Sequence, residues 1–187
     1  FLGVSTVMLT FTSQDLYRRT ITSPLTLVQL NGQLILGHVL FTLTVWALPA
    51  IASLIIGDIS TEGPQIALMA LNALVFAATA LSISYLISLF VRNANIQQAI
   101  VNVMALGSSF LGGVFVPQSL MGETVTTIAR FTPTYWYVRG NNSLSRLTSD
   151  FSNIPASYLQ GIVIQIGFMT AMFAVALVVS KQRRTST

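Results

Sequence analysis

Four stretches of this sequence are long, apolar and free of acidic side chains, lysine and arginine: residues 34–56, 65–91, 96–116 and 158–180. A helix rises 1.5 Å per residue, so about 20 apolar residues cross the hydrocarbon core of a bilayer. Hydrocarbon offers no water to backbone N–H and C=O groups, so a spanning segment must be a helix or part of a closed barrel. The lack of strict alternation between apolar and polar residues favours helices, and we predict four membrane spans.

The low content of charged residues excludes several classes of protein. Only 7% of the residues are Asp, Glu, Lys or Arg, whereas soluble domains carry about 25%. The net charge of +4 comes from cations at the ends of apolar runs, with no basic stripe among aromatics, so we predict no nucleic-acid partner. The chain has no cysteine, which removes disulfides, thiolate nucleophiles and cysteine-based metal sites, and we predict no metal site.

The distribution of lysine and arginine predicts how the chain is oriented. Six of the nine cations fall on one side if residues 13–33 and the tail 181–187 are cytoplasmic, and the positive-inside rule favours that side. Residues 57–64 and 117–157 then lie outside. Residues 1–12 are too short to span and are interpreted as the end of an earlier span, so that the chain looks like the C-terminal portion of a longer protein.

The outer segment 117–157 is long enough to need structure of its own. Its apolar residues recur near helical period from Leu120 to Phe131, which predicts an amphipathic helix on the outer membrane face. Pro133 is expected to end that helix. The aromatic run Tyr135-Trp136-Tyr137 is expected at headgroup depth, and a loop over 139–155 is expected to lead into the last span.

The segment QDLYRRTITSPL, residues 14–25, places Arg18 and Arg19 side by side in a charge-poor chain. Ser23 and Pro24 fit the N-cap and first position of a helix, which predicts that the next element runs over 24–56. The arginines fit two roles. They could anchor the topology at anionic headgroups, or they could dock a soluble partner.

The order of these features resembles the type-2 ABC transporter permease family. The residues that carry the resemblance are RRTITSPLTLVQLNGQLILG and, most specifically, SSFLGGVFVPQSLMGETVTTIARFTPTYWYVRG. It covers essentially the whole chain. It implies an all-α polytopic membrane helix bundle, a single transmembrane domain over 1–187. The domain would hold the end of one span (1–12), a cytosolic coupling helix (13–23), four full spans (24–56, 65–91, 96–116 and 158–180), an outer interfacial helix and loop (117–157) and a cytosolic tail (181–187).

The resemblance also implies a function. The chain would be the permease subunit of an ATP-driven exporter that works by alternating access, in a bacterial cytoplasmic membrane. Its coupling segment would insert into a separate ABC ATP-binding subunit, with Arg18, Arg19, Ser23 and Pro24 as the recognisable positions. No G-x-x-x-x-G-K-[ST] motif occurs, so ATP and Mg²⁺ would bind the partner and this chain would bind no cofactor. A second permease subunit, identical or different, would complete the membrane unit.

Asn72, Asn102 and Gln165 are uncharged polar residues deep within the predicted spans. A polar group in hydrocarbon needs a partner, so each is expected to make hydrogen bonds between helices or to line a translocation path. The apolar residues that could face a lipophilic cargo, or simply lipid or the protein core, are Met104, Phe110 and Phe115.

Two pairs of small residues lie four positions apart, Ser108 with Gly112 and Ser109 with Gly113. Small residues at this spacing let a second helix approach closely. The pattern fits a contact between two subunits and a tight contact within one chain equally well.

Three other functions fit the sequence less well than a transport subunit does. An intramembrane serine protease would need Ser108 or Ser109 beside His38, but the predicted spans put His38 near the cytosolic boundary and Ser109 toward the outside, beyond hydrogen-bond reach. A coupled secondary carrier would normally show a charged residue within a span, and the predicted spans contain no Asp, Glu, Lys or Arg. A membrane-anchored assembly factor is a further alternative. We therefore predict a transport subunit and no catalytic residues.

The predicted topology can be tested directly because the native chain lacks cysteine. Single cysteines at 17–20 should react with a membrane-impermeant maleimide only after the cells are opened, and single cysteines at 141–146 should react in intact cells. The opposite pattern would contradict the predicted orientation.

Overall fold

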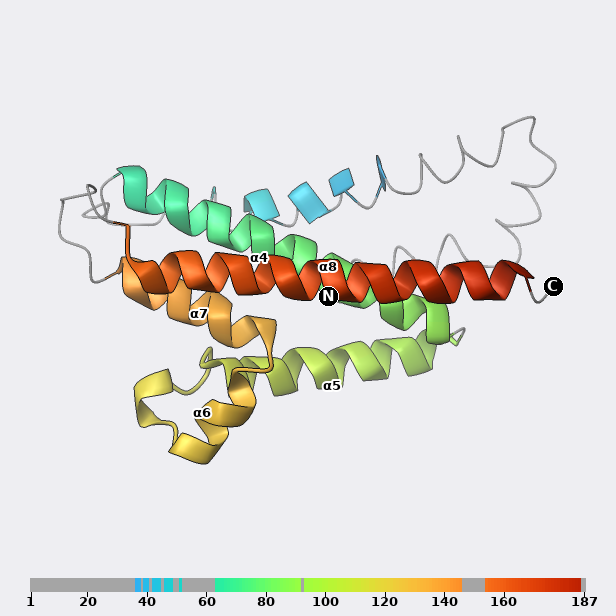
Figure 1. The fold of residues 1–187 in the computed structure, drawn as a ribbon. Coiled ribbons are helices and arrows are strands. Elements are labelled where there is room, and N and C mark those ends of the chain that lie inside the picture. Colours follow the sequence, from blue (N-terminus) through green and yellow to red (C-terminus); the bar gives the residue numbers. More distant parts are fainter. Residues whose placement is uncertain are drawn as a thin grey trace.

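The computed structural model describes residues 36–37, 39–40, 42–44, 46–48, 51, 63–91, 93–145 and 154–185. The main elements are α4 (Gly63–Phe90), α5 (Ala94–Gly112), the 3-10 helix η1 (Gln118–Leu120), α6 (Glu123–Ala129), α7 (Pro133–Leu144) and α8 (Ala156–Thr185) (Figure 1). Within these ranges the chain is helical and contains no strand, which confirms the predicted all-α class. The predicted segments 1–12 and 13–23 lie outside the described residues.

Two of the described helices are long and apolar enough to cross a membrane, over Gln65–Phe90 in α4 and Ala156–Val179 in α8. These stretches correspond to the predicted spans 65–91 and 158–180. Only 11% of the most apolar part of α8 is buried in the structure. So large an exposed apolar surface suits lipid better than water.

α4 and α8 pack along each other and run in the same direction (Figure 1). The Tyr158 hydroxyl near the start of α8 donates to the carbonyl of Leu68 near the start of α4, at 2.9 Å. The two helices therefore begin at the same end of the bundle. This agrees with the prediction that both follow segments on the same side of the membrane.

α5 has a defined beginning and end. The side chain of Asn93 accepts hydrogen bonds from the backbone N–H groups of Asn95 and Ile96 and caps the first turn. Gly113 follows the last turn with a φ of 96°, in the left-handed region that glycine adopts without strain. The helix therefore stops at Gly112. The apolar run had predicted that it would continue to residue 116.

The segment after α5 contains two α-helices where the sequence predicted one. α6 occupies part of the predicted interfacial helix. Pro133 was expected to close that helix, but it is the first residue of α7, and the hydroxyl of Thr132 caps the new helix by accepting from the N–H of Tyr135 at 3.4 Å. Proline suits a first helical position because its missing N–H is not needed there. The predicted loop from 139 onward is wrong as far as Leu144, since α7 continues to that residue.

α7 lies between α8 and α5 and also contacts α4 (Figure 1). Tyr135 and Trp136 are buried, at 4% and 7% exposure, and their rings pack edge to face with centroids 5.3 Å apart. The core they form includes Ala129 and is completed by Leu111, Ile164 and Phe168. α7 folds back against α8 and buries these two side chains within the protein, and their expected position at headgroup depth stays a prediction.

α5 and α7 approach each other closely at Gly112. A Cβ atom added at Gly112 would lie 2.5 Å from the Cγ2 atom of Thr134, a distance that real Cβ atoms do not show. The small residue at this position therefore serves a contact within the chain, which was one of the two readings of the sequence pattern.

Substitution of Gly112 by alanine should destabilise the protein, because Thr134 or the start of α7 must move. We expect a loss of about 1–3 kcal/mol, the usual cost of overpacking. Thermal unfolding of the purified protein in detergent would measure it.

Gly107 on the same helix is the matched control, since an added Cβ there meets nothing within 4 Å. Gly107→Ala should be neutral or slightly stabilising, because alanine favours helices more than glycine does. Equal unfolding temperatures for the two variants would contradict the close contact.

Candidate functional site

Asn72, in the middle of α4, is fully buried and joins three helices through its side-chain amide. Its Nδ2 atom donates to the carbonyl of Tyr137 at 2.9 Å and to Oδ1 of Asn141 at 2.8 Å, both on α7. Its Oδ1 atom accepts from Nε2 of Gln165 on α8 at 2.9 Å. The amide thus has a partner on each neighbouring helix.

Gln165 is also fully buried and has two further hydrogen bonds. Its Nε2 atom donates to the carbonyl of Gly161 at 3.1 Å, and its own backbone carbonyl accepts from the hydroxyl of Thr79 at 3.2 Å. The second bond ties α8 to α4 again. Its Oε1 atom is buried and has no hydrogen-bond partner among the described residues.

The same face of α4 carries a third polar residue. Gln65 donates to the carbonyl of Leu144, the last residue of α7, at 3.0 Å. Gln65, Asn72 and Thr79 are spaced by seven, close to two helical turns, so they share one face. We call the network the polar seam; its members are Gln65, Asn72 and Thr79 on α4, Asn141 on α7, and Tyr158 and Gln165 on α8.

Two glycines allow the helices of the seam to approach. A Cβ at Gly140 would lie 3.0 Å from Nδ2 of Asn72, and a Cβ at Gly161 would lie 3.0 Å from the carbonyl oxygen of Trp136. A larger residue at either position would push α7 away from α4 or α8. Hydrogen bonds and close packing therefore act at the same place.

The structure brings together Asn72 and Gln165 but does not include Asn102 in their network. Hydrogen bonding between helices was one of the two roles expected for these residues, and Asn72 and Gln165 make such a bond with each other. Asn102 lies on α5 and is partly exposed. The lining of a translocation path by the three residues stays a prediction.

Sequence reasoning missed Gln65, Thr79 and Tyr158. The first two could have been found from the sequence, because Gln65, Asn72 and Thr79 are polar residues seven positions apart in an otherwise apolar segment. No comparable signal marks Tyr158, because its partner is a backbone carbonyl.

α5 presents a different kind of surface. Its exposed large apolar side chains are Ile96, Val103, Met104, Leu106 and Phe110, and the following turn adds Val114 and Phe115. The rings of Phe110 and Phe115 lie 4.7 Å apart between centroids. The Ser108 hydroxyl donates to the carbonyl of Ala105 in its own helix, and the carbonyl of Ser109 accepts from the N–H groups of Gly113 and Val114.

The comparison with protein families decides the class of this protein. Residues 1–180 match the family model described as ABC-2 family transporter protein. The chain belongs to the ABC-2 transporter family. This confirms the resemblance drawn from the sequence and makes the chain a membrane transport subunit and not a catalytic enzyme. A search of curated proteins and a search of solved structures each found no significant match.

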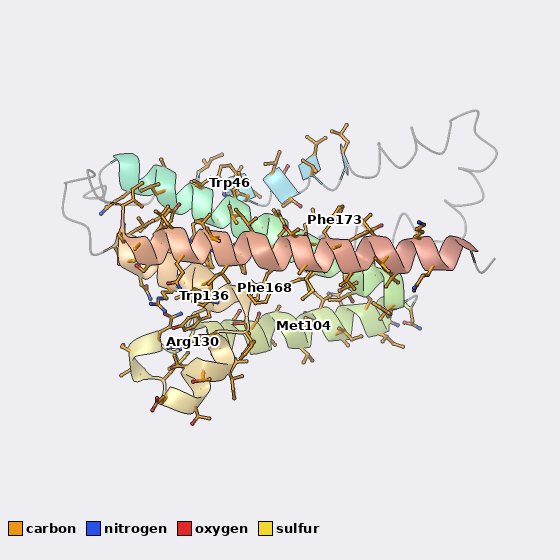
Figure 2. The ribbon with its side chains drawn as sticks, viewed as in Figure 1. Trp46, Met104, Arg130, Trp136, Phe168 and Phe173 are labelled. Atoms are coloured by element: carbon orange, nitrogen blue, oxygen red, sulfur yellow. The ribbon has the colours of Figure 1, made fainter. Side chains whose placement is uncertain are left out.

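The predicted coupling positions Arg18, Arg19, Ser23 and Pro24 lie outside the described residues of this ABC-2 permease, as does His38. Part of the predicted span 24–56 is described. There the indole N–H of Trp46 donates to the carbonyl of Ala70 on α4 at 3.0 Å. Trp46 therefore links that span to α4 (Figure 2).

Removal of the Asn72 amide should destabilise the permease. Asn72→Ala would leave Asn141 and the amide of Gln165 without their shared partner. A buried polar group left unpaired costs about 1–3 kcal/mol, and bonds between helices in membranes lie toward the low end of that range. Thermal unfolding in detergent should show the loss.

Asn102→Ala is the control, because it removes the same amide from a partly exposed position outside the seam and should change stability little. A double-mutant cycle with Gln165→Ala should give a coupling energy for the Asn72–Gln165 pair. Additive effects of the two substitutions would contradict their direct interaction.

Proposed function

We propose that this chain is the permease subunit of an ATP-driven ABC exporter. It forms half of the translocation path and couples to a separate ATP-binding subunit by alternating access. The observation that carries the proposal is the match of residues 1–180 to the ABC-2 transporter family. The two long apolar helices support the membrane placement. Export as the direction of transport follows the resemblance noted in the sequence.

In this proposal α4, α7 and α8 move as one block. The polar seam joins them, and contacts at Gly140 and Gly161 leave no space between them. Displacement would enter at the coupling segment 13–23, continue into the span 24–56 and reach α4 through the hydrogen bond from Trp46 to Ala70. A short rigid element that pushes on packed helices is a recognised way to transmit such a movement.

α5 is proposed as the mobile wall of the path. Its end is joined to the block by Gln118, which donates both to the carbonyl of Gly112 and to the carbonyl of Tyr135, at 2.8 and 2.9 Å. The rest of the helix exposes apolar side chains such as Met104 and Phe110, with Asn102 on the same helix. An apolar wall with a few amides suits a lipophilic cargo.

The proposal requires two kinds of partner. One is an ABC ATP-binding subunit that holds ATP and Mg²⁺. The other is a second permease subunit, identical or different, which supplies the opposite half of the path. The expected location is the cytoplasmic membrane of a bacterium, with the coupling segment on the side where ATP is available.

Reversal of the two arginine charges tests the coupling. The chain should co-purify with the ATP-binding subunit encoded by a neighbouring gene. Arg18→Glu combined with Arg19→Glu should reduce the recovered complex by at least about tenfold, since like charges placed against a partner cost several kcal/mol. Quantitative co-purification from detergent would measure the loss.

Lys181→Glu is the matched control, because it reverses a cation in the cytosolic tail that the proposal keeps out of the docking site. It should leave the amount of complex unchanged. If the double arginine variant binds as well as this control, the arginines only anchor the topology and the proposed coupling contact is wrong.

A further inference from the structure

Arg139 on α7 is a half-buried cation held by two aromatic side chains. Its guanidinium carbon lies 5.5 Å from the centroid of the Trp136 ring, and its Nη1 atom donates to the hydroxyl of Tyr135 at 3.4 Å. Both rings are buried, so they fix the position of the guanidinium group. A guanidinium group carries five N–H donors, and the structure uses one of them in a long hydrogen bond.

Trp136 also connects this group to a second arginine. Its indole N–H donates to the backbone carbonyl of Arg130 at 2.8 Å, in the turn between α6 and α7. The face of one indole therefore holds the Arg139 side chain, and its edge holds the Arg130 backbone. Figure 2 shows Arg130 and Trp136 together toward the end of the bundle where α8 begins.

No carboxylate neutralises these two cations in the part of the chain that the structure describes. Glu123 is the only acidic residue in those ranges; it is exposed and makes no ion pair with a described side chain. Arg130 is exposed as well. The corner formed by Arg130, Trp136 and Arg139 therefore carries two positive charges and free N–H donors, an arrangement that suits a phosphate group.

The surface beside this corner is apolar. The exposed side chains around α6 include Leu120 at 75%, Ile128 at 53% and Phe131 at 79%. A free anion would gain nothing from such neighbours. A ligand that joins a phosphate to hydrocarbon chains would use the cations and the apolar surface together.

We propose that the corner of Arg130, Trp136 and Arg139 binds the headgroup phosphate of an anionic phospholipid, with the acyl chains against Ile128 and Phe131. Arg139 presents its N–H donors from the face of Trp136, and Arg130 adds a second charge at the rim. The bound lipid holds the turn between α6 and α7 at the membrane surface. The proposal rests on the membrane location and not on coupling to an ATPase, so binding can be tested without the partner subunit.

Trp136 can report the binding itself. The chain has two tryptophans, so Trp46→Phe leaves Trp136 as the only one. The full chain would be reconstituted in vesicles of phosphatidylcholine with phosphatidylglycerol brominated on its acyl chains, and the quenching of Trp136 compared with that by brominated phosphatidylcholine. We expect phosphatidylglycerol to be preferred at Trp136 by about fivefold or more, as cations near an anionic lipid surface would give.

Arg130→Gln combined with Arg139→Gln should abolish the preference, and Arg139→Lys should weaken it, since lysine keeps the charge but lacks the planar fork. Lys181→Gln, at the other end of α8, should keep it. The emission of Trp136 in pure phosphatidylcholine vesicles checks that each variant retains the core.

Three outcomes would overturn the proposal. The first is an unchanged preference in the double variant whose core is intact. The second is loss of quenching on addition of millimolar inorganic phosphate, which would make the ligand a free anion. The third is an equal preference at Trp46 in a Trp136→Phe variant, which would show that the lipid is enriched around the whole protein.

Discussion

The described bundle depends most on the hydrogen bonds that the side-chain amide of Asn72 makes with α7 and α8. Lipid chains are as apolar as leucine, so helices in a bilayer gain little from hiding apolar side chains against one another. What holds them is close packing and hydrogen bonds that hydrocarbon cannot replace. Asn72 meets both requirements, because it bonds to α7 and α8 where Gly140 lets α7 approach.

This dependence explains how α7 can lie inside the bundle. The helix carries polar residues such as Asn141 and is shorter than a span, so its apolar content alone would not hold it there. It is held at one end by the bond from Gln65 to Leu144, near its middle by Asn72 and at its start by the contact of Thr134 with Gly112. The buried rings of Tyr135 and Trp136 follow from that placement.

The sequence predicted the features that the bilayer dictates and missed those that depend on individual backbone angles and partners. The membrane-spanning parts of α4 and α8 follow from the length of apolar segments, because hydrocarbon thickness sets that length. The end of α5 at Gly113 depends on a left-handed φ, and the role of Pro133 depends on which side of it the helix forms. Apolar periodicity reports neither of these.

The candidate site shows the same division. Asn72 and Gln165 stand out because amides are rare in apolar segments, but three acceptors of the seam are the backbone carbonyls of Tyr137, Leu144 and Leu68. Every residue has such a carbonyl, so nothing in the sequence marks the partner. An amide deep in an apolar segment is therefore predictable as a hydrogen-bonding residue, whereas a backbone carbonyl that accepts from it has to be seen.

The distribution of these bonds also indicates where a conformational change would be least costly. If α4 separated from α8, Asn72, Thr79 and Gln165 would lose hydrogen-bond partners at the same time. Each buried polar group left unpaired would cost about 1–3 kcal/mol of free energy. The exposed side chains of α5, among them Met104 and Phe110, can exchange lipid for another protein surface at little cost. In the proposed transport cycle, movement should therefore shift α5 or the proposed second subunit against an intact block of α4, α7 and α8.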